Sequence, residues 1–356
     1  MKTDRRRLLT FASYLTALLV LFFSGTAGAQ MRERKLVLGI GLNEDHPQGL
    51  AVKHLADTLR RESGGKIQLA LMAGGKVGND LTMIRDLQKG TLDMTVPDSS
   101  TLVGLNKGFG VINMPFLFER EDDADSLLDG AFGTRLLDSL KEHGIVGLGW
   151  WENGFRSTTN NVRPIAKAKD FEGIRIRVIQ NPLFREVFKT LGAEPVEMPF
   201  PEVFNGLKDK KVEGQENPVI TIYSSRFFEV QKYLSLTRHI YSAWPLLISK
   251  KTWDDLSSDE QNLFRKAARE ATLYERKTIR EAAARAIAEL QKAGMIVNEP
   301  TPATLAHFRQ LLRPVNQRYR SEFGQEWIDE LYLARLKTES DRVKAILEAE
   351  GRKPAP

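Results

Sequence analysis

The sequence predicts an α/β protein, and three observations lead to this fold class. With 356 residues, of which 42% are hydrophobic, the chain can bury a sizeable core and is long enough for two lobes. Short apolar runs alternate with amphipathic helical stretches along most of the chain. Glycines and other turn residues separate them, so the pattern favours βαβ units and a parallel sheet.

The first 29 residues have the three parts of an export signal. A basic start with Arg5, Arg6 and Arg7 comes before a mostly apolar run, Leu8–Phe23, and before the small residues that end at Ala29. We therefore predict that residues 1–29 are a signal peptide that is cleaved before Gln30.

Two alternatives for this segment stay open. One is a membrane anchor, although the uninterrupted apolar stretch Ala17–Phe23 is short for a span. The arginines also loosely fit a twin-arginine signal. Residues 1–29 hold four basic side chains and one acidic side chain, so their removal lowers the formal net charge from +6 to +3. A nucleic-acid partner is therefore not indicated.

The sequence contains no cysteine. An exported chain without cysteine forms no disulfides, so packing alone must stabilise it, and it has neither a thiol nucleophile nor thiolate metal ligands. The sequence also lacks a complete dinucleotide loop, a phosphate-binding loop, a Gly-x-Ser-x-Gly elbow and a His-Glu-x-x-His pair. We therefore predict no catalytic residues, no cofactor and no metal site.

The elements expected in the first part of the mature chain alternate between strand and helix. Gly64-Gly65 and Gly90 follow the two helices, as expected of helix ends. The expected strands are Leu36–Gly41, Ile67–Met72, Leu92–Val96 and Val146–Trp151, and the expected helices are Gly49–Ser63 and Asp80–Lys89.

A second series of the same kind begins near Ile174. Its expected elements are the helix Pro182–Leu191, the strand Pro195–Met198, the helix Pro201–Lys208 and the strand Lys232–Leu236.

The C-terminal third changes to a charged, alanine-rich helical pattern. Ser257-x-x-Glu260 is a capping box, and the pattern continues to about Lys292 before Gly294. An unbroken helix of this length would extend about 50 Å, longer than one small lobe, and would cross both lobes. Two helices with a kink between them are the alternative. More helix is expected from Pro302 to the region of Tyr332, followed by a C-terminal tail at residues 341–356.

Two motifs bear on function. The alternation in Ile174–Val178 puts three apolar residues on one face of a strand and Arg175 and Arg177 on the other. From spacing alone, both arginines could be solvated groups of a half-exposed strand. About forty residues later comes Gly214-Gln215-Glu216-Asn217-Pro218, which by itself suggests a turn ended by proline.

Together these motifs resemble the binding-site signature of TRAP (tripartite ATP-independent periplasmic) transporter solute receptors, the DctP family. The resemblance extends from Lys35 to about Gly324. It implies a two-lobed periplasmic binding protein fold with hinge strands and a long helix that spans both lobes. We expect lobe 1 at residues 35–154 plus about 243–282, and lobe 2 at residues 155–242 plus about 283–340.

The resemblance also implies ligand-binding roles. Arg177 would clamp a substrate carboxylate through its planar guanidinium, and Arg156 would contribute to the same pocket. We expect an anion to balance the charge of the two arginines, because an unpaired buried charge is costly. Asn217 would bond the ligand through its amide, which donates and accepts at once.

The other lobe matches the family more loosely. Asn43, Asp80 and Asp98 would bond the remaining hydroxyl or carbonyl groups of the ligand. Asp80 as a helix cap and Asp98 as a turn residue are the structural alternatives.

Four aromatic residues complete the predicted pocket. Phe200 fits the pocket aromatic of the family, and Trp151, Tyr241 and Trp244 would form the pocket floor, where aromatic faces pack on the C–H faces of sugars. Core packing is an equally good interpretation of each of them.

The function implied by the resemblance is transport in the periplasm without catalysis. Closure of a hinge would trap a small organic carboxylate, and TRAP membrane permease subunits would receive it. The stretch from Arg177 to Pro182 looks like the subgroup that takes sugar acids, so we prefer a uronate or aldonate. A C4 dicarboxylate, a 2-oxo acid or an aromatic acid are alternatives within the class. A periplasmic sugar-acid enzyme and a sensor partner without transport are alternatives from other classes.

Overall fold

The computed structural model describes residues 31–349, so the predicted signal peptide and residues 350–356 lie outside the described range. In the described range, nine strands form one continuous mixed sheet in the order β2-β1-β3-β8-β4-β7-β5-β6, with β9 paired to β8. Their bounds are β1 (Arg34–Gly39), β2 (Ile67–Met72), β3 (Met94–Thr95), β4 (Ile145–Asn160), β5 (Arg175–Val178), β6 (Glu194–Glu197), β7 (Gly214–Pro218), β8 (Tyr233–Ser249) and β9 (Ile296–Asn298).

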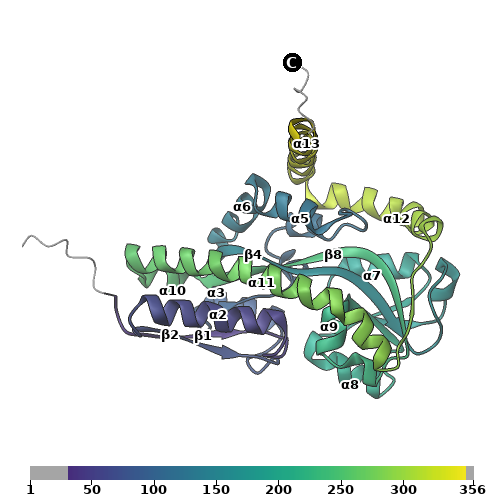
Figure 1. The fold of residues 1–356 in the computed structure, drawn as a ribbon, viewed down its shortest axis with the longest axis horizontal. Helices are drawn as coiled ribbons and strands as arrows, with labels where there is room; N and C mark the ends of the chain where they lie inside the picture. The colour runs from purple at the N-terminus through teal and green to yellow at the C-terminus, as the bar shows by residue number, and fades with distance from the viewer. Residues whose placement is uncertain (1–30, 350–356) are drawn as a thin grey trace, which may run out of the picture.

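Helices cover both faces of this sheet (Figure 1). They are α2 (Pro47–Glu62), α3 (Asp80–Lys89), α4 (Phe109–Ile112), α5 (Glu121–Leu128), α6 (Ala131–Asp138), α7 (Pro182–Thr190), α8 (Val203–Lys208), α9 (Val219–Ser224), α10 (Lys250–Asp255), α11 (Ser258–Lys292), α12 (Pro302–Phe323) and α13 (Gln325–Ala349). Single turns of 3₁₀-helix add η1 (Ser99–Leu102), η2 (Lys141–His143), η3 (Ala168–Phe171), η4 (Phe200–Glu202) and η5 (Phe227–Glu229).

The first three strands and their helices form parallel βαβ units, as predicted. β1 pairs parallel with β2 on one side and with β3 on the other. The ring of His46 caps α2 by accepting from the backbone N–H of Gln48 at 2.9 Å. Asn79 caps α3 by accepting from the N–H of Thr82 at 3.1 Å, and Gly90 ends α3 in the left-handed conformation that glycine adopts most easily.

Two long antiparallel strands, β4 and β8, form the centre of the sheet. β8 pairs with β3 at one end, and β4 pairs with β7 at the other, so both strands pass from one half of the molecule to the other. Their pairing shifts register at three places, one of them between Glu152 and Gly154, where Gly154 has φ +104°. These are the hinge strands that the family resemblance implies.

The sheet differs from the expected one in its centre. The strands at both ends are parallel, but β4 and β8 make the middle antiparallel. Both strands are also much longer than the runs Val146–Trp151 and Lys232–Leu236 that the sequence indicated. Apolar periodicity missed the remainder because polar side chains are buried there, among them Thr158 and Thr237, whose hydroxyls lie 3.3 Å apart.

Helix α11 is one continuous helix of 35 residues, the long helix that the sequence predicts. It packs against α2, β4 and α9, which lie in different halves of the molecule (Figure 1). Its first turn is fixed to β1 because buried Glu260 accepts from Arg34 Nε at 3.1 Å and Nη2 at 2.9 Å. The pKa of Glu260 falls to about 2, because these bonds outweigh the effect of burial.

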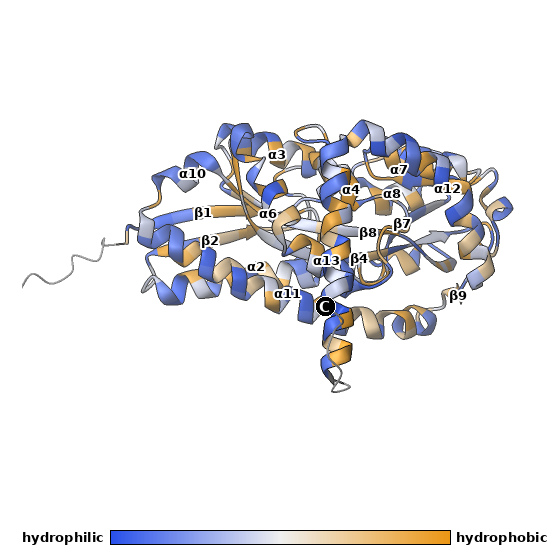
Figure 2. Cartoon of the chain, turned by 90° about the horizontal axis from the view of Figure 1, so that it is seen from above, coloured by the Kyte–Doolittle hydropathy of each residue, from blue (hydrophilic) through white to orange (hydrophobic). Residues whose placement is uncertain are grey.

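The core lies on both faces of the sheet. Neighbouring residues on β4 point to opposite faces, so Trp150 packs with Phe109 and α6 while Trp151 packs with β1, α2 and α11. Trp151 Nε1 donates to Thr272 Oγ1 on α11 at 3.1 Å. In Figure 2 the covering helices carry hydrophilic and hydrophobic residues side by side, as expected of helices with one buried face.

The last two helices cover the sheet face opposite α11. α12 packs on α7, and α13 packs on α5 and α6 before its end projects from the body (Figures 1 and 2). Because α13 continues to Ala349, the part of the predicted tail from residue 341 to 349 is helical. No helix within residues 31–349 is long and apolar enough to cross a membrane.

The capping box of α11 gives a test of the fold. Ser257 Oγ accepts from Glu260 N at 3.2 Å, and Glu260 Oε2 accepts from Ser257 N at 2.8 Å. We expect Ser257→Ala to lower the free energy of unfolding by about 1 kcal/mol, because a helix N–H loses its acceptor. Urea denaturation measures this. Ser258→Ala, at the exposed next position, is the matched control, and an equal loss in both variants would contradict the capping role.

Candidate ligand-binding site

A small cavity lies beside the central strands, at the carboxyl ends of β1, β3, β5 and β7. Its volume is about 40 Å³, which is room for about three water molecules. The residues that line it are Gly41, Leu42, Gln48, Asp80, Val96, Asp98, Asn153, Arg156, Arg177, Ile179, Phe200, Asn217, Thr221 and Trp244. Seven of the ten residues predicted from the sequence are among them.

Arg177 on β5 is a buried cation that forms no ion pair within the described residues. Its side chain is 1% exposed, and its Nε donates to the carbonyl of Met198 at 2.9 Å. Burial lowers the pKa of Arg177 to about 10, and the repulsion of Arg156 adds to this effect. Such a guanidinium has donors left to offer to a carboxylate.

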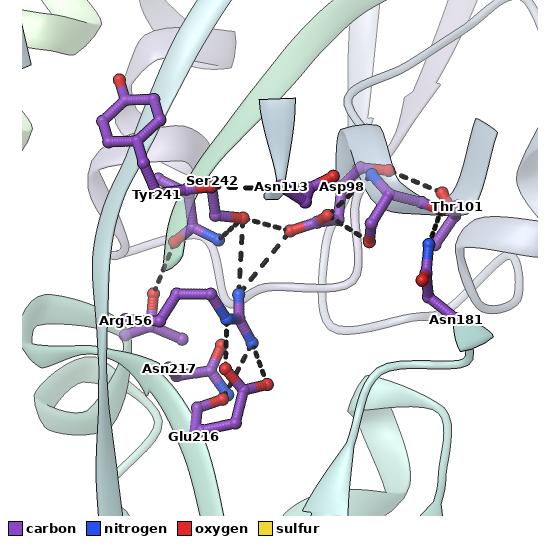
Figure 3. A network of polar contacts seen from close by, with 12 residues as sticks. Asp98, Thr101, Asn113, Arg156, Asn181, Glu216, Asn217, Tyr241 and Ser242 are labelled. Atoms are coloured by element: carbon purple, nitrogen blue, oxygen red, sulfur yellow. Dashed lines mark hydrogen bonds and ion pairs between the residues drawn. The ribbon is translucent and has the colours of Figure 1, made fainter. Parts of the chain in front are cut away.

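Arg156 on β4 is equally buried, but it has an acidic partner. Its Nε and Nη2 donate to the two carboxylate oxygens of Glu216 at 2.5 and 2.7 Å, and Nη2 also donates to the Glu216 carbonyl at 2.8 Å (Figure 3). The pairing of β4 with β7 sets this geometry, because it places both residues at neighbouring positions of the two strands. The expectation that a ligand must balance both arginines is therefore wrong for Arg156, since Glu216 neutralises it.

Glu216 is itself fully buried and meets a second nitrogen, His239 Nε2, at 3.3 Å. Burial alone would raise the pKa of Glu216, but the charge of Arg156 and the bond to His239 outweigh it and lower the pKa. The carboxylate therefore stays ionised and holds Arg156 in place.

Asp98 follows β3 and is 4% exposed. One carboxylate oxygen accepts from Ser100 N and Oγ at 3.0 and 2.6 Å, which makes Asp98 the cap of η1, and the other accepts from Ser242 Oγ at 2.5 Å. Arg156 Nη1 lies 3.7 Å from the second oxygen (Figure 3). Asp98 thus combines the two roles that the sequence left open, a turn residue and a member of the cavity lining.

Asp80 begins α3 and faces the same cavity. One of its oxygens accepts from the backbone N–H of Asp98 at 2.9 Å, and no hydrogen bond to the other is recorded within the described residues. Burial raises the pKa of Asp80 to about 6, the negative charge of Asp98 adds to the rise, and Arg177 opposes it. Asn79, one residue earlier, is the actual cap of α3.

Asn217 and Phe200 also line the cavity. Asn217 belongs to β7 rather than to a turn, and its Nδ2 donates to Gln215 Oε1 at 2.6 Å. The ring of Phe200 lies 5.9 Å from the Arg177 guanidinium carbon. Trp244 lines the cavity as well and contacts the ring of His46 edge-on.

The structure places three predicted site residues elsewhere. Asn43 is exposed and borders a neighbouring cavity with Gly74 and Arg226. Trp151 is in the core against α11, and the ring of Tyr241 packs between Phe118 and Phe155, pointing away from the Arg156 cluster (Figure 3). For both aromatic residues, the core alternative describes the position found.

Sequence reasoning missed three polar residues that line the cavity: Gln48, Asn153 and Thr221. Asn153 was visible in the motif Glu152-Asn153-Gly154-Phe155-Arg156, but Gln48 and Thr221 lie in helices and carry no motif. No cluster of three or more histidine, cysteine or acidic residues suited to a metal ion occurs among residues 31–349.

The comparison with protein families decides the class of this chain. A model of the bacterial extracellular solute-binding proteins of family 7, the DctP family, matches residues 38–322. The chain belongs to this family. It is a TRAP periplasmic solute-binding protein, and its class binds solutes for transport and is not enzymatic.

Similar proteins share this fold over most of their length. The 2,3-diketo-L-gulonate-binding periplasmic protein YiaO of Escherichia coli is 34% identical, over 82% of this chain and 87% of that protein. The sugar acid binding protein DctPAm of Advenella mimigardefordensis, solved with galactonate, is 37% identical with a TM-score of 0.85, over 86% and 99% of the two chains. A TRAP protein of Sulfurospirillum deleyianum with bound succinate is 25% identical with a TM-score of 0.81, over 85% and 99%.

The charge of Asp80 gives this TRAP protein a pH-dependent stability. A carboxyl whose pKa is about 6 when folded and 3.8 when exposed favours folding below pH 3.8, and this contribution is lost as the pH rises through 6. We expect Asp80→Asn to be more stable than the wild type at pH 7.5 by roughly 3 kcal/mol. The gain should shrink as the pH falls from 6 to 4, which chemical denaturation across this range measures. A gain in the free energy of unfolding that does not depend on pH would contradict the raised pKa of Asp80. So would the same gain in Asp57→Asn, on the exposed face of α2.

The two buried arginines of this TRAP protein should differ in their effect on stability. We expect Arg156→Met to cost about 3–5 kcal/mol, because it leaves Glu216 buried without its partner. Arg177→Met removes a buried charge that forms no ion pair in the described range, so we expect a change within about 1 kcal/mol. Denaturation of ligand-free protein compares them, and equal losses would contradict the difference in pairing.

Proposed function

We propose that this protein is the extracytoplasmic receptor of a TRAP transporter for a sugar acid, a uronate or an aldonate. The observation that carries the proposal is Arg177, a buried guanidinium without an ion pair inside the described range, in a cavity that also contains hydrogen-bond acceptors. The ligand carboxylate would bind Arg177, and Asn217 beside it would bond the same group or its neighbouring hydroxyl.

The charges of the cavity favour one carboxylate over two. Arg156 is neutralised by Glu216, so among the described residues that line the cavity Arg177 is the cation left for the ligand. Asp80 and Asp98 also face the cavity, and a second carboxylate near them would meet like charge. Their oxygens suit hydroxyl donors instead, and Trp244 offers an aromatic surface for the C–H face of a sugar.

Relatives support the sugar acid without excluding the alternatives. Two of the similar proteins bind a sugar acid or its oxidised form by their names, 2,3-diketo-L-gulonate and galactonate, but another was solved with succinate. A C4 dicarboxylate, a 2-oxo acid or an aromatic acid therefore remain alternative ligands. Because the cavity is only about 40 Å³, a six-carbon ligand requires the cleft to open before it enters.

The transport cycle that we infer uses the hinge strands. Lobe 1, residues 35–154 with about 243–282, and lobe 2, residues 155–242 with about 283–340, would close on the ligand by bending β4 and β8. The closed form would be recognised by TRAP membrane subunits, and an ion gradient rather than ATP would drive uptake. Export to the periplasm would use the signal at residues 1–29, through the general or the twin-arginine route. A sensor partner without transport would share this cavity, and genes for permease subunits beside the receptor gene would distinguish the two.

Substitutions of two arginines on β5 test whether Arg177 binds the ligand carboxylate. We expect Arg177→Met to abolish binding of every carboxylate in a panel of uronates, aldonates, dicarboxylates, 2-oxo acids and aromatic acids. Isothermal titration on protein freed of co-purified ligand measures this. Arg175→Met is the matched control, because Arg175 is half-exposed at the start of β5 and pairs with Glu213.

The outcomes separate the alternatives. A wild type that binds a uronate or aldonate most tightly supports the sugar acid, whereas tighter binding of a dicarboxylate overturns that choice and keeps the receptor. Wild-type affinity in Arg177→Met would overturn the clamp itself.

A further inference from the structure

Gln48, in the first turn of α2, has a buried oxygen without a partner. The residue is 1% exposed and lines the cavity. Its Nε2 donates to the carbonyl of Val96 at 3.0 Å, whereas its Oε1 has no hydrogen-bond partner within the described residues. Buried side-chain polar atoms are nearly always paired, and an unpaired one destabilises a protein.

The orientation of this amide is fixed by its neighbours. The carbonyl of Val96 only accepts hydrogen bonds, so it must face the nitrogen of Gln48 and not the oxygen. An amide flip would place two acceptors against each other. Oε1 therefore stays an acceptor, and it requires a donor.

The ring of His46 and the hydroxyl of Thr221 do not supply that donor, because their protons are used in a series of hydrogen bonds. His46 Nδ1 accepts from the Gln48 N–H, so its Nε2 carries the proton and donates to Thr221 Oγ1 at 3.3 Å. Burial lowers the pKa of His46 to about 3, which keeps this ring neutral. Thr221 in turn donates to Asn153 Oδ1 at 3.3 Å.

This series of hydrogen bonds ends at Asp98, in the charged cluster of the site. Asn153 Nδ2 donates to Ser242 Oγ at 3.2 Å, and Ser242 donates to Asp98, as Figure 3 shows for the last step. The ring proton of His46 and the hydroxyl protons of Thr221 and Ser242 are therefore donated to groups other than Gln48. Because no described residue donates a hydrogen bond to Gln48 Oε1, the occupant of the cavity is the donor that we consider for it.

We propose that Gln48 Oε1 accepts a hydrogen bond from a hydroxyl group of the bound ligand and thereby selects hydroxylated acids over acids of the same chain length without hydroxyls. This inference rests on the proposed function of the cavity and names a specificity-determining residue for it. A ligand without that hydroxyl leaves the buried oxygen unpaired, and sites of this kind discriminate strongly against such analogues. A second carboxylate at this position would present an acceptor to an acceptor.

The test uses Gln48→Met, which keeps the length of the side chain and removes the amide. Titration calorimetry compares the aldonate of highest affinity in the panel with hexanoate, the unsubstituted six-carbon acid. We expect the affinity for the aldonate to fall about tenfold, while the affinity for hexanoate stays the same or rises. Gln68→Met, at an exposed glutamine on β2, is the matched control and should change neither.

If the ratio of the aldonate affinity to the hexanoate affinity is the same in Gln48→Met as in the wild type, the proposal is overturned. An equal loss for both ligands is one such result. A crystal structure of the wild type with the aldonate gives a second readout that does not depend on the variant. A ligand hydroxyl within hydrogen-bond distance of Gln48 Oε1 supports the proposal, and its absence contradicts it. Failure of the proposed function is distinct, because the wild type would then bind no carboxylate and Arg177→Met would have no effect.

Discussion

The constraint that organises this site is the cost of burying a guanidinium. The cavity contains two buried arginines on strands either side of β7, and among residues 31–349 only Arg156 has an acidic partner close enough for an ion pair. Glu216 lies between them in the sheet order, and it bonds Arg156 while influencing Arg177 only at a distance. The result is one arginine that is paired within the sheet and one that we propose as the partner of the solute carboxylate.

The sequence indicated the positions of most of the site but not this division of roles. Arg177 and Asn217 belong to motifs, and the alternation of a strand predicts which face Arg177 occupies. The partner of Arg156 depends on the pairing of β4 with β7, which joins residues 60 positions apart. No local pattern contains that information, so the charge balance could be settled only in three dimensions.

The parts of the fold that were missed have a common physical reason. Apolar periodicity detects strands that contact an apolar core, and it found the beginning of β4 and of β8. Beyond those points the strands bury polar side chains such as Thr158 and Thr237, whose hydroxyls lie within hydrogen-bond distance of each other. Gln48 and Thr221 were not predicted as cavity residues for a related reason. A helix that presents one polar residue to a cavity has the same sequence pattern as any amphipathic helix.

The path of β4 and β8 also limits how such receptors can change. Each strand contributes to both halves of one sheet, and Trp150 and Trp151 send neighbouring side chains into cores on its two faces. Neither half is a contiguous piece of chain with a complete sheet of its own, so a lobe cannot be cut out and exchanged as a module between relatives. New solute preferences in this architecture are therefore expected from substitutions within the shared cavity, such as at Gln48, for which we propose a role in specificity.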